Sequence, residues 1–152
     1  MSQNEMTVEA PPGVVWEMLA DAPTYEDWVV GNKEIRDHDA AWPGPGAEFH
    51  HTVGIGPLAV KDKTVSLEAQ QARRLVLNVR VLPIGHGKVT FDLIPAGPGT
   101  TRVQMAEEPL AGPAKVFWPL LIPLVKVRNA ETLRRLKRCA EARQQAAAPG
   151  ER

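Results

Sequence analysis

The sequence contains a single cysteine, Cys139, among its 152 residues. One thiol excludes an intramolecular disulfide and a cysteine-based zinc site, and it fits a reducing compartment best. The chain also lacks net charge, because 18 lysines and arginines are matched by 18 aspartates and glutamates. Without an overall positive field, we do not expect binding to nucleic acid.

Long hydrophobic runs are missing as well. The apolar run 116–127 is only about a dozen residues long, whereas a helix that spans a bilayer needs roughly 20. The run also contains Lys126. A membrane span is therefore excluded. Residues 1–5 have neither the basic nor the apolar part of a secretory signal, so we expect a cytoplasmic protein.

The motifs of several common chemistries are absent. No Gly-x-Ser-x-Gly elbow occurs, which argues against an esterase of the common type. Segment 54–56 superficially begins a glycine-rich phosphate loop, but a proline and a strand follow where a helix should begin. His50 and His51 are adjacent on a predicted strand and leave it on opposite faces, so they cannot chelate one metal ion. We expect neither a metal nor a cofactor.

What the sequence does contain is a regular order of strands and helices. Residues 7–9 predict a short first strand, and residues 14–20 and 24–28 predict two short helices. From residue 33 onward the hydrophobic period changes to two. This alternation, with the glycine- and proline-rich turns between its segments, predicts six further strands. They are 34–38, 48–53, 60–68, 75–82, 88–94 and 100–108.

The predicted strands have one apolar face and one polar face. In the last of them, Val103 and Met105 point to one side and polar residues to the other, as in an antiparallel sheet that is covered on one side only. The cover is the C-terminal helix, whose apolar stripe over 122–140 follows three-and-four spacing. We therefore predict one α+β domain over residues 1–143, followed by a frayed tail at 144–152.

Two prolines, Pro119 and Pro123, lie at the start of this C-terminal helix. Each removes a backbone hydrogen bond and clashes with the preceding turn, so we predict a kinked or broken start. A helix that is held off its sheet leaves space beneath it. We expect Phe117 and Leu121 to face that space.

Several local motifs resemble the helix-grip (SRPBCC) superfamily, which includes the START lipid-transfer domains, the pathogenesis-related Bet v 1 allergens and the polyketide cyclase/dehydrase-like proteins. The segments that carry the resemblance are 12–21, 25–28, 42–46, 99–101 and 133–137. The resemblance implies a helix-grip fold, in which a curved antiparallel sheet of about seven strands surrounds a long C-terminal helix. It also implies a cavity between sheet and helix for lipids, polyketides or other apolar molecules. The superfamily has no universal catalytic motif.

Two ionisable side chains, those of His51 and Glu107, are expected on the apolar face of the sheet. Apolar surroundings tune carboxyl and imidazole groups for general acid/base catalysis on a carbonyl substrate. These two residues are therefore the catalytic candidates. The alternative is that each lies at the end of its strand, at a rim in contact with water or a backbone partner.

Asn129 lies on the apolar stripe of the long helix. Its amide could orient a ligand oxygen, or it could satisfy backbone groups that Pro123 leaves without a partner. The other candidates for ligand binding are apolar, although residues with these spacings also form ordinary cores. They are Trp28, Val79, Phe91, Met105, Phe117 and Leu121.

Three functions are open at this point. The first is the binding or carriage of a small hydrophobic molecule, lipid or polyketide-like, in the implied cavity. The second is an enzyme of the polyketide cyclase/dehydratase type that uses His51 and Glu107. The third is a protein-interaction module in which the cavity is vestigial. The sequence leaves the identity of the ligand and the oligomeric state open.

Overall fold

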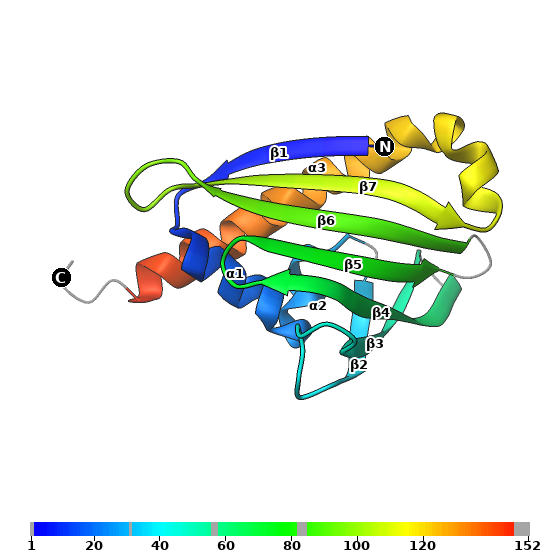
Figure 1. Cartoon of the computed structure of the whole chain (residues 1–152), viewed down its shortest axis with the longest axis horizontal. Coiled ribbons are helices and arrows are strands. Elements are labelled where there is room, and N and C mark those ends of the chain that lie inside the picture. The colour runs from blue at the N-terminus through cyan, green and yellow to red at the C-terminus, as the bar shows by residue number, and fades with distance from the viewer. Residues whose placement is uncertain (1, 31, 56–57, 82–84, 148–152) are drawn as a thin grey trace.

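The computed structural model describes residues 2–30, 32–55, 58–81 and 85–147, and in it a curved sheet wraps around one long helix (Figure 1). The predicted α+β helix-grip architecture is confirmed, including the two short helices after the first strand. The elements are β1 (Ser2–Val8), α1 (Pro12–Ala20), the 3₁₀ turn η1 (Ala22–Thr24), α2 (Tyr25–Trp28), β2 (Asn32–His38), β3 (Glu48–Ile55), β4 (Leu58–Gln70), β5 (Arg74–Val81), β6 (Gly85–Pro95), β7 (Thr101–Ala111) and α3 (Pro113–Ala147).

The sheet has seven strands in the order β1-β7-β6-β5-β4-β3-β2. All of these neighbours are antiparallel, as the short predicted connections require. The first strand closes the order by pairing with the last, with Ser2 opposite Glu107 and Val8 opposite Thr101. The edges of the sheet are therefore β1 and β2.

One of these edges, β2, is irregular. Its register against β3 shifts between Asn32 and Glu34 and again between Ile35 and Asp37. Such shifts are typical of β-bulges, which twist a strand locally and interrupt its ladder. The side chains of Glu34 and Asp37 are exposed.

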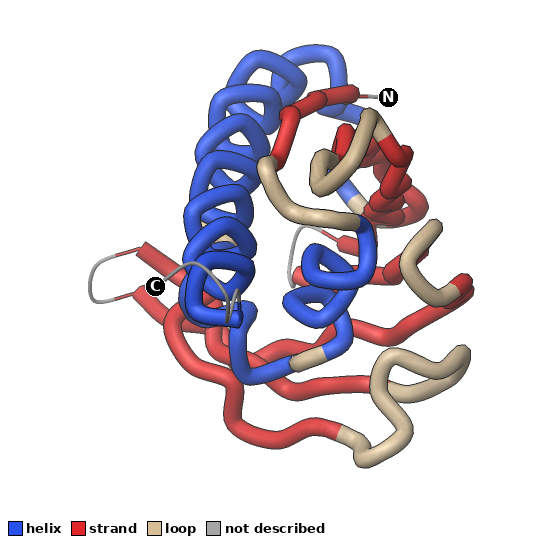
Figure 2. The backbone as a smooth tube through the Cα atoms, turned by 90° about the vertical axis from the view of Figure 1, so that its left-hand side faces the viewer, coloured by secondary structure: helices blue, strands red, loops and turns tan. Residues whose placement is uncertain are grey.

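The alternation in the sequence assigns the faces of the strands correctly. Phe49 and His51 on β3 are buried, and so are Phe91 on β6 and Val103 and Met105 on β7. Figure 2 shows all the helices on the same side of the sheet, inside its curve. The buried side chains of the strands therefore meet the helices on this inner face.

Aromatic rings form the densest part of the core. The Tyr25 ring lies 4.4 Å from Trp28 and 4.9 Å from Phe49, measured between centroids, and Phe49 lies 4.8 Å from Trp42. Tilted and edge-to-face pairs of this kind stabilise a core beyond the area that they bury. The cluster attaches α2 to β3 and to the loop before it.

The hydroxyl of Tyr25 gives one prediction for the dependence of stability on pH. It is buried and donates a 2.8 Å hydrogen bond to the carbonyl oxygen of Leu19, and burial raises the pKa of Tyr25 well above its usual value. Above pH 10 the unfolded chain ionises while the folded chain holds its proton, so stability is full below about pH 10 and falls above it by up to about 1.4 kcal/mol per pH unit. Denaturant unfolding between about pH 8 and 12 measures the slope.

A direct control for this prediction exists, because Tyr25 is the only tyrosine in the chain. Ultraviolet titration of the phenol therefore reports on this residue alone. The native protein should resist ionisation until it unfolds, whereas the denatured protein should titrate at about pH 10. A native titration curve that matches the denatured one would contradict the buried position.

The long helix takes one of its two predicted forms, a bent start rather than a broken one. α3 is helical without interruption from Pro113 to Ala147, so the prolines at 119 and 123 do not break it. Figures 1 and 2 show instead that its first turns run in a different direction from the rest. Pro119 and Pro123 are both exposed, so the carbonyl groups that they leave without a partner can reach water, and the helix bends rather than ends.

The two halves of α3 are covered to different degrees. Leu133, Leu136 and Ala140 are buried against the sheet and α1–α2, whereas Leu121 and Val125 are only half-buried. The helix therefore packs closely in its second half and less closely near the bend. It also continues to Ala147, so the first part of the expected tail at 144–152 is helical, and 148–152 lies outside the described residues.

Strand ends were the least accurate part of the prediction. β1 begins at Ser2, well before the predicted 7–9, and β7 continues to Ala111 through Pro109. Position 82, the predicted end of the fifth strand, lies outside the described residues. The extension of β1 matters for the site, since it places Ser2 opposite Glu107 within the ladder.

Candidate functional site

The carboxylate of Glu107 is the centre of a polar cluster beneath α3. The residue lies on β7, and 15% of its side chain is exposed. Its Oε1 accepts a hydrogen bond of 3.0 Å from Asn129 Nδ2 and lies 3.6 Å from Arg128 Nη1. Because both partners belong to α3, the cluster joins the helix to the strand that it covers.

Arg128 and Asn129 are themselves held by other groups. Asn129 is fully buried, and its Oδ1 lies 3.5 Å from Arg128 Nη1. Arg128 Nε donates to the carbonyl oxygen of Val30 at 3.2 Å, and the amide of Val30 donates to Thr132 Oγ1. The amide of Asn129 therefore orients a protein carboxylate. Hydrogen bonds to a charged acceptor are among the stronger ones in proteins, so the carboxylate is firmly placed.

A glycine leaves open backbone next to this carboxylate. Gly87 on β6 lies opposite Val79 on β5 and opposite Pro109 on β7. A β-carbon added to Gly87 would lie 3.9 Å from Glu107 Oε2 and 3.6 Å from the carbonyl oxygen of Glu108. The second carboxylate oxygen therefore lies over a position of the strand that has no side chain. Glycine within a strand is typical of a place where another group approaches the backbone closely.

A second polar group of residues lies on β3 and β4. His51 is 2% exposed, and its Nε2 lies 3.0 Å from Thr64 Oγ1. Its ring centroid is 5.3 Å from that of Phe49. Asp62, opposite His51 in the ladder, has a fully buried side chain and accepts a 2.5 Å hydrogen bond from Arg80 Nε. This part of the sheet therefore contains an ion pair whose carboxylate is buried and whose arginine is 34% exposed.

The ion pair lies where the hairpin β3–β4 separates from the hairpin β5–β6. The ladder between β4 and β5 runs from the pair Gln70–Arg74 to the pair Thr64–Val79. Beyond this pair β4 stays with β3, and β5 stays with β6. The bond from Arg80 to Asp62 therefore connects the two hairpins at the point where their backbone ladder ends.

The two catalytic candidates share the inner face but are not brought together. Three strands separate β3 from β7, so His51 and Glu107 lie about 19 Å apart along the sheet, at about 4.8 Å for each step between strands. Each has its own partner, Thr64 for the imidazole and Asn129 for the carboxylate. His51 is also buried rather than at a rim. His51 and Glu107 therefore occupy two separate polar positions on this face and do not form an acid–base pair with each other.

The predicted ligand-binding residues fall into three groups. Trp28, Phe91 and Met105 are buried in the core, where the Trp28 ring lies edge-on to Phe91 at 5.9 Å. Val79 and Leu121 are half-buried. Phe117 is 54% exposed, which corrects the expectation that it faces the interior. The bend turns this part of the helix away from the sheet, so its ring faces solvent.

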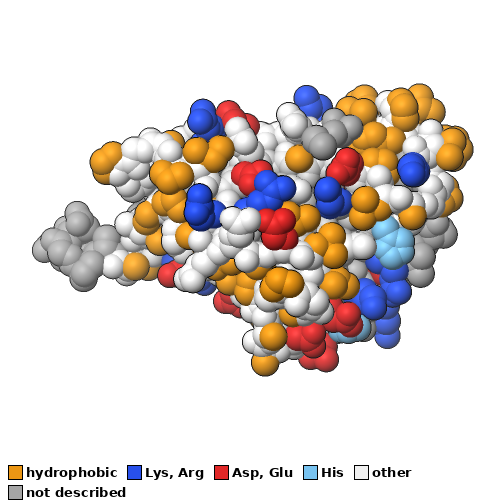
Figure 3. Space-filling view, in the orientation of Figure 1, with side chains coloured by type: hydrophobic (Ala, Val, Ile, Leu, Met, Phe, Trp, Pro, Cys, Tyr) orange, Lys and Arg blue, Asp and Glu red, His pale blue; other side chains and the backbone are white. Residues whose placement is uncertain are grey.

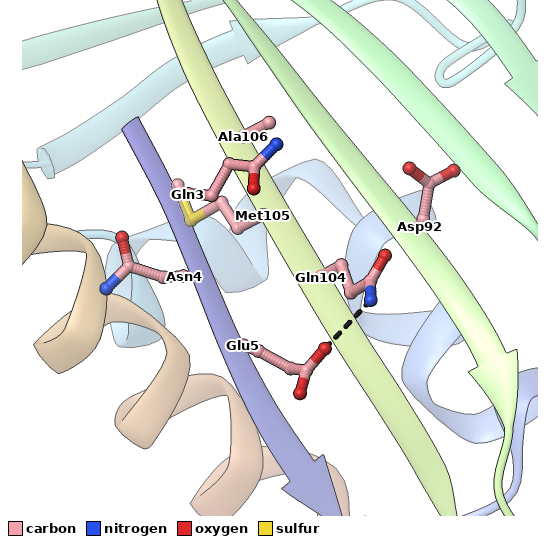
Figure 4. A pocket seen from close by; sticks show the side chains of 7 residues that line it. All are labelled: Gln3, Asn4, Glu5, Asp92, Gln104, Met105 and Ala106. Atoms are coloured by element: carbon pink, nitrogen blue, oxygen red, sulfur yellow. Dashed lines mark hydrogen bonds between the residues drawn. The ribbon is translucent and has the colours of Figure 1, made fainter. Parts of the chain in front are cut away.

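The structure also has a hollow of about 350 Å³, but in a different place from the predicted cavity (Figure 4). It lies over β1, β7 and β6 and is lined mainly by polar side chains. Two of them, Gln104 and Glu5, are joined by a 2.8 Å hydrogen bond. A polar, open hollow does not suit a hydrophobic ligand. The cavity beneath α3 therefore stays a prediction.

Sequence reasoning missed several residues of these clusters. Gly87 falls in the turn predicted between strands 75–82 and 88–94, although a glycine next to an alternating segment is also a signal for close approach to a strand. Asp62 and Thr64 belong to the inner face of β4, which is polar and so gives no apolar alternation. Arg80 meets Asp62 only because the ladder ends nearby, and no local pattern in the sequence indicates that contact.

Comparison with known proteins agrees with this architecture. The family model described as polyketide cyclase / dehydrase and lipid transport matches residues 2–141. A search of the curated proteins finds no match.

Solved structures with the same fold come from several bacteria. The Zhui aromatase/cyclase of a Streptomyces species is 19% identical, with a TM-score of 0.71 over 97% of this chain and 96% of its own. A Nitrosomonas europaea protein is also 19% identical, with a TM-score of 0.71 over 93% and 94%. A START superfamily protein from Mycobacterium smegmatis is 18% identical, with a TM-score of 0.62 over 95% and 96%. At these identities the similarity concerns the fold alone.

Proposed function

Because the chain belongs to the polyketide cyclase/dehydrase and lipid transport family, we propose that it binds a small, largely apolar molecule between the inner face of the sheet and the bend of α3. The observation that carries the proposal is the Glu107 carboxylate. Its Oε1 is held by Asn129, while its Oε2 lies over the bare backbone of Gly87. A carboxylate only accepts hydrogen bonds, so the bound molecule presents a hydroxyl or N–H group at this point.

The apolar part of the molecule lies against the half-buried side chains near this carboxylate. Val79 comes from β5, opposite Gly87, whereas Leu121 and Val125 come from the loosely covered part of α3. A few placed polar groups within a mainly apolar surface are typical of small-molecule sites. The polar end of the ligand sets its orientation, and the apolar end supplies most of its affinity.

Filling the space over Gly87 tests this proposal. Valine fits a strand, and its side chain would occupy the position next to Glu107 Oε2. With phenylnaphthylamine, a neutral apolar fluorophore with one N–H group, we expect Gly87→Val to weaken binding by roughly tenfold or more. Gly13→Val is the matched control, since a β-carbon at Gly13 meets open space. Equal affinity in the two variants, with circular dichroism unchanged, would overturn the proposal.

The carboxylate has its own matched pair of variants. Glu107→Gln keeps the size of the side chain and loses its charge, so we expect about fivefold weaker binding of the fluorophore. Glu108 is the next residue on the strand and forms an ion pair with Lys88. Glu108→Gln should therefore leave the affinity unchanged.

An enzyme of the aromatase/cyclase type is the second candidate. The buried His51 and the partly exposed Glu107 on one inner face favour it, as does the similarity to the Zhui aromatase/cyclase. Because the two residues are apart, each would act alone on a different part of an extended poly-carbonyl chain. If the protein is such an enzyme, Glu107→Gln abolishes turnover and leaves most of the affinity for the substrate. If it is a carrier, the same substitution lowers the affinity for the ligand, and neither form of the protein shows turnover.

A further inference from the structure

The first half of α3 exposes an unusual amount of apolar side chain. Five large residues are between 54% and 79% exposed. They are Val116, Phe117, Leu120, Leu124 and Val127, and we call them the apolar face of α3. Contiguous apolar patches of this kind on a protein surface mark sites of interaction.

The charges that α3 itself places along the apolar face are of one sign. From position 112 to 130 the sequence has no aspartate or glutamate. Lys115 and Lys126 are exposed near the two ends of the face, whereas Arg128, 39% exposed, is already paired with Glu107. The first acidic residue after the face, Glu131, is already paired with Arg134 and Arg135. The face is therefore apolar in its middle and positive at its ends.

Figure 3 shows the same arrangement on the surface. Apolar atoms gather over the start of α3, at the upper right of the view, with basic and acidic side chains beside them. Elsewhere on this side of the molecule acidic and basic groups alternate over the strands.

A lipid surface fits these features better than a second copy of the chain does. Two copies that met through this face would bring Lys115 and Lys126 of each against the same charges of the other, which is unfavourable. The bend also interrupts the straight seam that paired helices need. A bilayer with anionic lipids accepts the apolar side chains among its acyl chains and attracts the lysines at its surface.

We propose that the apolar face of α3 docks the protein onto the surface of membranes that contain anionic lipids. The helix lies in the interface and does not cross the bilayer. Within the described residues, no helix is long and apolar enough to span a membrane. The proposal is independent of the ligand site at Glu107, because the exposed side chains of the face are not those that surround Gly87.

Vesicle co-sedimentation tests the proposal with two pairs of variants. We expect binding to phosphatidylcholine vesicles with about 30% phosphatidylglycerol, and weaker binding to phosphatidylcholine alone or at high salt. The double variant Leu120→Gln/Leu124→Gln should bind roughly tenfold more weakly or worse. Leu67→Gln is the control, since Leu67 is 45% exposed on β4.

The second pair of variants tests the charges. Lys115→Glu/Lys126→Glu should lower the affinity by at least about fivefold for each lysine. The exposed Lys61 on β4 gives the control, Lys61→Glu. If both double variants bind vesicles as their controls do, the proposal is wrong.

Tryptophan fluorescence gives a direct measure of contact. Trp16, Trp28 and Trp42 are buried, whereas Trp118 is half-buried and lies on the same turns of α3 as the apolar face. Brominated lipids in the anionic vesicles should therefore quench Trp118, and Trp118→Phe should remove that quenching. The proposal is overturned if the lipids do not quench Trp118 and light scattering shows a dimer that Leu120→Gln/Leu124→Gln converts to monomers. That result would mean that the apolar face is an interface between copies of the chain.

The Gly87→Val variant distinguishes a failure of the membrane proposal from a failure of the proposed ligand site. It should bind anionic vesicles as the unmodified protein does, even where it fails to bind phenylnaphthylamine. Loss of vesicle binding in a folded Gly87→Val protein would contradict the independence of the two surfaces.

Discussion

Replacing Phe49 with alanine should lower the free energy of unfolding by about 3–5 kcal/mol. The side chain is 1% exposed, and its ring lies within 5.3 Å, between centroids, of three other rings. Truncation removes the buried ring, leaves a cavity between β3 and α2, and ends the edge-to-face contacts with Tyr25 and Trp42. Since a domain of this size is stable by only about 5–15 kcal/mol, the variant should be near the limit of folding.

The matched control is the same substitution at Phe117. That ring is 54% exposed on α3, so Phe117→Ala should change the free energy of unfolding by less than about 0.5 kcal/mol. Urea denaturation followed by circular dichroism measures both variants. Comparable losses at the two positions would mean that Phe117 is packed in the interior, as the sequence first indicated, and would contradict the observed bend.

Arg80→Ala should have the second largest effect, a loss of about 3 kcal/mol. Asp62 is fully buried, and the guanidinium of Arg80 donates to its Oδ1 at 2.5 Å. Without Arg80 a buried carboxylate loses this countercharge, and the hairpins β3–β4 and β5–β6 lose a bond between them where their ladder ends. The free energy of unfolding in urea at neutral pH measures the loss.

A second arginine on the same strand provides the comparison. Arg74 donates to Asp92 Oδ1 at 3.1 Å, but its side chain is 40% exposed and that of Asp92 is 35% exposed. Exposed ion pairs contribute about 0–1 kcal/mol, so Arg74→Ala should be nearly neutral. The double variant Asp62→Leu/Arg80→Met should also recover much of the loss, because an apolar pair has no charge to desolvate. If Arg80→Ala costs no more than Arg74→Ala, the ion pair does not hold the hairpins together.

The general fold was predictable because its signals are local. Period-two alternation on β3 and β7 placed Phe49, His51, Val103 and Met105 on one face, and all four are buried. The stripe of α3 was also predicted correctly from Asn129 to Ala140, where the helix is closely covered. These signals depend on neighbouring residues in the chain, so one sequence is enough to detect them.

The details of the site depend on contacts that are distant in sequence. The partners of Glu107 come from α3, more than twenty positions later, and were not assigned to it because register and helix orientation set that contact. The separation of His51 from Glu107 follows from the order of the strands, which puts three of them in between. The prolines of α3 were expected to kink or break the start of the helix. Which of the two occurs depends on their exposure, which is a property of the folded chain.

The bulged edge of the sheet has a consequence for how the protein behaves at high concentration. A regular edge strand offers a row of free amide and carbonyl groups to the next molecule, and two sheets can then join side by side. The register shifts along β2 interrupt that row, and the exposed charged side chains of Glu34 and Asp37 would lose their hydration against a second molecule. Growth of the sheet from one molecule into another is therefore disfavoured at this edge, which protects the chain against strand-mediated aggregation.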